Sequence, residues 1–197
     1  MTISPGEAVR YAWAGWLASW LVAALWSSRA ARRPPRRTET AYRLLTVIGA
    51  VLLFDLRLSW PWATIQVWRP GTDIAWFLVA IALLGFAVTW WARVVLGRLW
   101  SSGVAVKADH DMVTAGPYRL VRHPIYSGIL LSILATAAIR GTSAAVLGSA
   151  AIGFALFIKA RAEERFLRSE LGSDRYGSYA RRVPMLVPFT ALHTVRR

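Results

Sequence analysis

The stretch HDMVTAGPYRLVRHPIYSG, His110–Gly128, is polar and rich in turn-forming residues, and hydrophobic runs flank it on both sides. Pro117 and Pro124 interrupt any helix here, because proline lacks an amide donor and disfavours helical geometry in the residue before it. Irregular backbone that carries groups such as Arg122 and His123 does not belong in the lipid core. We therefore expect this stretch at a membrane edge or in a polar cavity.

The composition of the 197-residue chain points to a membrane rather than to the cytosol. Hydrophobic residues make up 56% of it, and its 11 tryptophans suit anchoring at a membrane surface. Cysteine is absent, which excludes disulfides, thiolate catalysis and cysteine-ligated metal. The net charge of +14 is spread between apolar runs, so it favours a membrane surface over nucleic acid as the partner.

Five apolar runs predict an all-α integral membrane protein with five transmembrane helices. The runs are Tyr11–Ser28, Leu44–Phe54, Ile74–Ala92, Pro124–Ile139 and Gly141–Ile158. The second is the shortest, and the segment after it, Leu58–Trp68, is expected in the membrane interface. The last two runs should form an antiparallel hairpin. From Lys159 the fifth helix should leave the membrane and continue to Leu171, where Gly172 can cap it.

The distribution of lysine and arginine predicts the orientation of these spans. Alternate connections hold 20 basic residues on one side and four on the other, the four being Arg10, Arg57, Arg69 and Arg140. The amino terminus is therefore expected outside, with the carboxy terminus and the His110–Gly128 stretch in the cytoplasm. The chain is expected to form a single membrane domain over residues 1–197, with helices 1–3 in residues 1–100.

Two motifs carry a resemblance to a known family. GPYRLVRHPIYSG at residues 116–128 and EERFLRSELGSDRYGSYARRVPMLVPF at residues 163–189 resemble the isoprenylcysteine carboxyl methyltransferase family. The similarity extends over about Leu96–Pro188, and the wider group includes phospholipid N-methyltransferases. It implies methyl transfer from S-adenosylmethionine to a lipophilic or prenylated acceptor, with carboxyl O-methylation as the expected reaction. Residues 101–197 would then be a methyltransferase-like half, with a cytoplasmic cofactor-binding region between helices 4 and 5 and their flanking segments.

The resemblance also implies which residues bind the cofactor. The expected set is His110, Asp111, Met112, Val113, Tyr118, Arg122, His123, Pro124, Ile125, Tyr126 and Glu163. From the residues themselves, Pro124 suits the first position of helix 4, which leaves free amides that can face the carboxylate of S-adenosylmethionine. Tyrosine ring faces can in addition stabilise its sulfonium cation. Tyr176 and Tyr179 are expected to anchor the chain at the interface instead.

The expected catalytic residues are Lys159, Arg161 and Glu164. Family members usually carry an arginine four residues before the cofactor glutamate, to hold the acceptor carboxylate. Here that position is Lys159, which supplies a point charge without a bidentate fork, and Arg161 follows two residues later. An amine or phenol acceptor would need a base, for which His123 and Glu164 are the candidates.

Several alternatives remain open at this stage. Glu163 and Glu164 are also spaced to form solvated pairs with Lys159 and Arg168 on one helix. The acceptor could be a phospholipid amine, a phenol or another hydroxyl. A membrane sterol-type reductase that uses NADPH and a non-enzymatic membrane scaffold are the rival functions. No His-x-x-x-His or His-x-x-Glu spacing is present, so no metal is expected.

Overall fold

The computed structural model describes residues 2–25, 36–54, 61–97, 113–171 and 173–190. Within them lie six α-helices and two short 3-10 helices, and no β-strand is assigned in the described part of the chain. The elements in order are α1 (Pro5–Ala24), α2 (Arg36–Phe54), η1 (Pro61–Thr64), α3 (Thr72–Leu96), η3 (Gly116–Arg119), α4 (Pro124–Arg140), α5 (Ser143–Leu171) and α6 (Ser173–Arg182). The predicted all-α class is confirmed.

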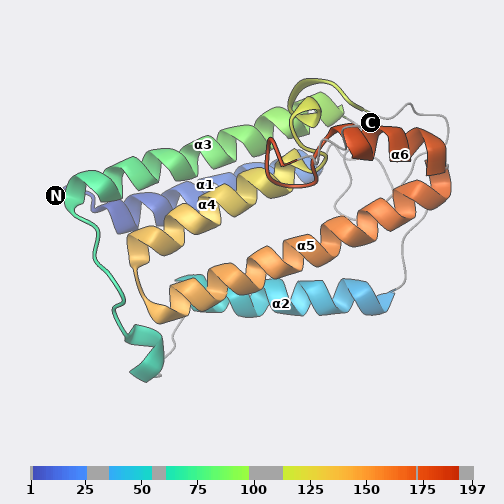
Figure 1. Ribbon diagram of the computed structural model, residues 1–197. Helices are drawn as coiled ribbons and strands as arrows, with labels where there is room; N and C mark the ends of the chain where they lie inside the picture. The colour runs from blue at the N-terminus through green and yellow to red at the C-terminus, as the bar shows by residue number, and fades with distance from the viewer. Residues whose placement is uncertain (1, 26–35, 55–60, 98–112, 172, 191–197) are drawn as a thin grey trace, which may run out of the picture.

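The five long helices form two groups (Figure 1). α4 packs mainly against α3, with α1 beside them, whereas α5 packs mainly against α2. The predicted connection between the fourth and fifth helices is present, but each of the two has its larger interface with a different partner. The predicted hairpin of these two helices is therefore present, and close glycine contacts give each helix a second, larger interface with another neighbour.

Glycines set the closest approach in both groups. A Cβ on Gly85 of α3 would lie 2.5 Å from the carbonyl oxygen of Gly128 in α4, and the reverse distance is also 2.5 Å. In the other group, a Cβ on Gly148 of α5 would lie 2.6 Å from the carbonyl oxygen of Gly49 in α2. Backbones come this close only where no side chain intervenes, as in membrane helix pairs with small residues at the interface.

The turn between α4 and α5 depends on Gly141, whose φ of 60° is left-handed. It also touches the segment before α3, since the amides of Val67 and Trp68 donate to its carbonyl oxygen at 2.7 and 3.2 Å. Any Cβ on Gly141 would collide with the Trp68 carbonyl oxygen. Glycine is thus required here both for the backbone conformation and for the contact.

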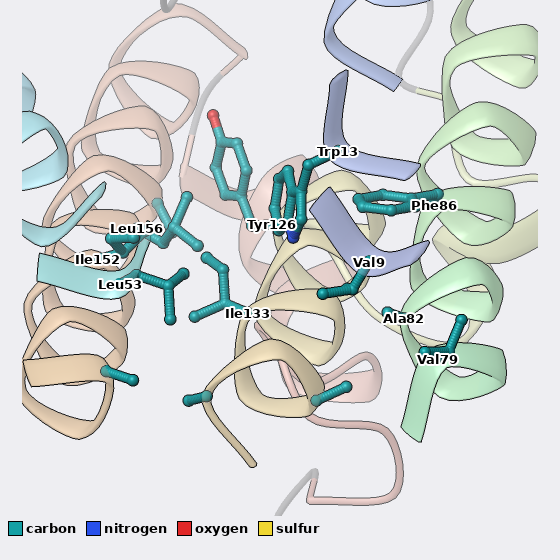
Figure 2. Packing of buried hydrophobic residues seen from close by; sticks show 14 residues of the cluster. Val9, Trp13, Leu53, Val79, Ala82, Phe86, Tyr126, Ile133, Ile152 and Leu156 are labelled. Carbon is teal, nitrogen blue, oxygen red and sulfur yellow. The ribbon is translucent and has the colours of Figure 1, made fainter. Parts of the chain in front are cut away.

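Aromatic residues of α1 join the two groups. Figure 2 shows Trp13 beside Phe86, with Ile133 and Tyr126 of α4 between this side and Leu53 and Leu156 on the other. The Trp13 ring meets Phe86 of α3 and Phe54 of α2 edge-on, at centroid distances of 4.8 and 5.6 Å. Its indole N–H donates to the Thr136 hydroxyl at 2.9 Å, so the buried polar atom is satisfied.

The helices relate to the predicted spans as follows. Two helices of the described chain, Thr72–Leu96 and Ser143–Ser169, are long and apolar enough to cross a bilayer, and Pro124–Arg140 is apolar but shorter. The predicted extension of the fifth helix to Leu171 is confirmed. α6 was not predicted, because its sequence is too polar to register as a span. Residues 26–28, 55–60 and 172, on which other predictions fall, lie outside the described residues.

Candidate functional site

The site is built around the first residue of α4. Pro124 occupies this position, as predicted, and His123 immediately before it has non-helical geometry with φ −124° and ψ 63°. Proline suits the position because its missing amide would have no helical partner there. The backbone amides of Arg122 and His123 donate to the carbonyls of Pro184 and Met185, at 2.8 and 3.1 Å. The segment after α6 therefore lies along the start of α4.

Two glutamates of α5 face this helix start. The Tyr126 hydroxyl donates a hydrogen bond to Glu163 Oε1, and His123 Nδ1 lies 3.3 Å from Glu163 Oε2. On its other side, His123 Nε2 lies 3.5 Å from Glu164 Oε1. Arg122 Nε donates to this same Glu164 oxygen at 2.6 Å. One imidazole thus sits between two carboxylates from consecutive positions of α5.

Burial and charge together fix the state of His123. Burial alone would lower its pKa, but the contacts with Glu163 and Glu164 outweigh burial and raise the pKa above the usual value of 6.5. The two carboxylates therefore favour the imidazolium form of the ring over the neutral form. The alternative that Glu163 and Glu164 only form solvent-exposed pairs with Lys159 and Arg168 does not describe this geometry. Arg168 does approach Glu164 at 3.8 Å, but the Glu164 side chain is only 5% exposed.

A lysine between two tyrosine rings lies one turn from the glutamates. Lys159 Nζ is 5.1 Å from the ring centroid of Tyr126 in α4 and 5.8 Å from that of Tyr42 in α2. Tyr42 is buried, and its position in the polar start of an apolar run gave no signal of a role in the site. Arg161 is exposed and contacts Phe157, at 6.0 Å from the ring centroid. The structure thus places Lys159, and not Arg161, beside the cluster.

The tail of the chain, which is α6 and the segment after it, covers one side of the site. Tyr176 and Tyr179 of α6 are buried, so the expectation that they anchor the chain at the interface is wrong. The Tyr179 hydroxyl donates to the carbonyl of Tyr118 at 2.6 Å, and burial raises its pKa to about 12. Arg122 Nη1 donates to the carbonyl of Ala180 at 2.7 Å and to that of Val183. Both tyrosine rings are therefore buried where α6 packs against η3 and the loop before α4, and they are not available to anchor the chain at the interface.

The predicted site residues other than Arg161 therefore fall into three sets. Those that meet in the cluster are Arg122, His123, Tyr126, Lys159, Glu163 and Glu164. Those in the adjoining backbone are Val113, Tyr118, Pro124 and Ile125, of which Tyr118 and Pro124 are buried and the other two partly buried. The remaining cofactor positions, His110, Asp111 and Met112, lie outside the described residues. Among described residues, no three His, Cys, Asp or Glu form a metal-binding group.

The cluster lies inside a region that matches a known family. Residues 78–169 match the model of the isoprenylcysteine carboxyl methyltransferase (ICMT) family. Over this region the chain is similar to the ICMT family. The predicted resemblance is thereby confirmed, with a different extent: the match begins within α3 and ends before α6.

Relatives with assigned names fall into more than one class. A cobalt-zinc-cadmium resistance protein, CzcN, of Cupriavidus metallidurans is 36% identical over 62% of this chain and 55% of its own length. Methanethiol S-methyltransferase 2 of Bradyrhizobium diazoefficiens is 31% identical over 76% of this chain and 59% of its own. Protein-S-isoprenylcysteine O-methyltransferase B of Arabidopsis thaliana is 28% identical over 62% of this chain and 66% of its own length. The chain thus spans between about half and two thirds of the length of these relatives.

Proposed function

We propose that this protein is a membrane methyltransferase that moves the methyl group of S-adenosylmethionine to a lipophilic acceptor, with a carboxylate as the acceptor group. The observation that carries the proposal is the buried cluster of His123, Glu163, Glu164 and Lys159 within the region of ICMT similarity. Relatives named as S- and O-methyltransferases support the reaction class.

The donor set of the cluster fits S-adenosylmethionine. His123 Nε2 is buried, with no well-aligned hydrogen-bond partner among the described residues. The Glu163 and Glu164 carboxylates are acceptors that suit an amino group and ribose hydroxyls. The first turn of α4 supplies backbone amides for a carboxylate. The rings of His123 and Tyr126 stack in parallel beside this cluster, with their centroids 5.4 Å apart.

When bound, S-adenosylmethionine supplies an electrophilic methyl group on a sulfonium. The protein's own contribution is then to orient the acceptor and to exclude water. Lys159 is the cation for orientation, because its ammonium is held by two rings beside the cluster. Burial of Glu164 and His123, at 4% and 8% exposed, keeps the surroundings dry.

The state of His123 bears on the class of acceptor. Two carboxylates flank His123 and stabilise its protonated form, and in that form the ring has no free site to accept a proton from the acceptor, which makes it a poor general base. An acceptor that arrives already ionised needs no such base. A carboxylate satisfies this condition at neutral pH, whereas a phospholipid amine or a phenol does not. The proposal therefore favours carboxyl methylation over the amine and phenol alternatives.

A thiol acceptor is the second candidate. Its support is the relative named methanethiol S-methyltransferase 2, which aligns over 76% of this chain. A thiol is mostly protonated at neutral pH, so this candidate requires that its proton be lost to water or that Lys159 lower its pKa. The thiolate then concentrates its charge on one atom, and the point charge of Lys159 suits it at least as well as a carboxylate. The arginine usual in the family would instead suit the two oxygens of a carboxylate.

The proposed arrangement in the membrane has five spans, with the amino terminus outside and the carboxy terminus in the cytoplasm. Its support is the asymmetry of 20 basic residues against four, together with the apolar character of α3, α4 and α5. The cofactor would then enter from the cytoplasm and the acceptor from the bilayer. Reporter fusions after Arg37 and Arg140 should read cytoplasmic and external, respectively, and the opposite result would contradict this orientation.

Calorimetry with S-adenosylmethionine tests the cofactor. The full-length protein in detergent should bind it, Glu163→Gln should weaken binding at least about ten-fold, and Arg165→Gln, on the exposed side of α5, should not. Transfer of labelled methyl to a prenylcysteine, a long-chain thiol and a phospholipid amine then separates the acceptor classes. Binding of NADPH in place of S-adenosylmethionine would overturn the proposal in favour of a reductase.

A further inference from the structure

A second cavity lies at the end of the bundle opposite His123. The starts of α1 and α3, the end of α4 and the segment before α3 surround it, and these lie together at the same end in Figure 1. Its volume is about 450 Å³. This falls within the range of about 300–1,000 Å³ that is typical of small-molecule sites. The proposed methyl transfer makes no use of it.

Three arginines line this cavity: Arg10 from α1, Arg69 before α3 and Arg140 at the end of α4. Charge counting assigns only four basic residues to the connections at this end, so three of the four converge on one cavity. None of its described lining residues is acidic. The acid of α1, Glu7, is hydrogen-bonded to Ser4 in a capping box and also interacts electrostatically with Arg10, but it does not line the cavity.

The start of α3 adds to the positive potential. Its N-cap is Gly71, which has no side chain to satisfy the first amides of the helix. Thr72 and Ala75, one turn apart, both line the cavity, so the first turn of this 25-residue helix borders it, although Asp73 in the same turn offsets part of the helix dipole. Arginines from three segments and an uncapped helix start together form a binding environment for an anion.

The inner walls of the cavity are apolar. Val9, Phe54 and Ile139 line it, and the Thr136 hydroxyl at its base is occupied as the acceptor of the Trp13 indole N–H. The Gln66 side chain is also occupied, since its amide donates to the carbonyls of Arg140 and Gly141 at 3.0 and 3.1 Å. A basic rim over an apolar interior suits an amphiphilic anion better than a small hydrated one.

We propose that this cavity binds the phosphate of an anionic lipid headgroup, with Arg10, Arg69 and Arg140 on the phosphate and an acyl chain against the apolar wall. Arginine forks match phosphate oxygens, and phospholipid headgroups carry a phosphate at both membrane surfaces. The inference does not depend on the methyltransferase proposal, because the two sites lie at opposite ends of the molecule.

Lipid titration of the purified full-length protein tests this site. The protein in neutral detergent is titrated with phosphatidylglycerol, phosphatidylcholine and inorganic phosphate, and binding is followed by native mass spectrometry and thermal shift. We expect preference for phosphatidylglycerol over phosphatidylcholine. Arg10→Gln and Arg69→Gln should each weaken phosphatidylglycerol binding roughly ten-fold, because each removes a charge-assisted contact. Both side chains are exposed, so folding should be retained.

Arg181→Gln, at an exposed position of α6 at the other end, is the matched control and should bind like the wild type. Inorganic phosphate binding that is lost in the same two variants, without lipid binding, would support the anion site and assign it to a soluble phosphate. Equal affinity for both lipids, or equal losses in all three variants, would overturn the proposal.

Discussion

Arg122 donates from Nε to Glu164 Oε1 at 2.6 Å, and this contact joins the loop before α4 to a helix 42 residues later. Both side chains are nearly buried, at 11% and 5% exposed. The same guanidinium donates from Nη1 to the carbonyls of Ala180 and Val183. One arginine therefore holds α5, the start of α4 and the tail in register, which gives it a structural task in addition to the predicted contact with the cofactor.

Replacing Arg122 should destabilise the protein strongly. Arg122→Ala leaves the buried Glu164 carboxylate without its closest partner, and breaking a buried pair on one side costs about 3–5 kcal/mol. Arg165→Ala, on an exposed part of α5, should change the free energy of unfolding by less than about 0.5 kcal/mol. Denaturant unfolding in detergent measures both values. Equal, small losses would mean that the tail is held by other contacts.

The ion pairs of His123 should make stability depend on pH. The pKa of His123 is raised in the folded state, so its contribution is fully present below the unfolded value of 6.5 and is lost as pH rises through the folded pKa. The gap in melting temperature between wild type and His123→Gln should therefore be larger at about pH 6 than at about pH 9. Thermal unfolding of the protein without cofactor checks this, and a gap that widens with rising pH would contradict it.

The sequence was most informative where one local property dominates. Apolar runs located α3, α4 and α5 to within a few residues, and the proline rule placed the start of α4 at Pro124. The charged extension of α5 was also predictable, because its helix-forming residues continue without a breaker as far as Leu171. The family motif brought His123, Tyr126 and Glu163 together before any geometry was known.

What the sequence missed depends on contacts between distant segments. The preference of α4 for α3 arises from Gly85 and Gly128, which meet only in the folded protein. Burial of Tyr176 depends on α6 folding back over the start of α4, and an isolated polar helix carries no signal of that packing. Tyr42 enters the site from outside the matched region of 78–169, so no motif marked it.

Closing the gap at Gly85 should disturb the α3–α4 interface. The added methyl of Gly85→Ala would lie 2.5 Å from the Gly128 carbonyl, a backbone atom that cannot move alone. We expect a loss of about 1–3 kcal/mol in the free energy of unfolding. Gly15→Ala in α1 is the matched control, since no heavy atom of the described residues lies within 4 Å of its added methyl. That variant should be neutral or slightly stabilising, because alanine favours a helix more than glycine does. A similar loss in both variants would mean that the close contact at Gly85 is not the cause.

Tyr42 should act as a positioning residue for Lys159. Tyr42→Leu removes one of the two rings near the ammonium, a contact worth about 0.5–1 kcal/mol, or roughly two- to five-fold. We expect KM for the acceptor to rise by this factor, with little change in cofactor affinity. Tyr42→Phe keeps the ring and should restore wild-type KM. Steady-state methylation and calorimetry separate the effects, and failure of the phenylalanine variant would indicate a role for the hydroxyl instead.

Lys159 itself should decide how an anionic acceptor is used. Its ammonium is the cation beside the cluster, whereas Arg161 is exposed against Phe157. Lys159→Ala should lower kcat/KM for a prenylcysteine carboxylate by about ten- to a hundred-fold, since a partly desolvated charge-assisted contact is worth about 1.5–3 kcal/mol. Arg161→Ala and the control Arg165→Ala should stay near the wild type.

Lys159→Arg distinguishes the two proposed acceptors, because a guanidinium fork matches two carboxylate oxygens but not a single thiolate sulfur. The variant should keep or improve activity on the carboxylate and lose activity on a long-chain thiol. The same assay with labelled methyl donor compares both acceptors for all four variants. Small and equal losses of activity in all four variants would show that Lys159 does not orient the acceptor. The acceptor would then have to be an uncharged amine or hydroxyl.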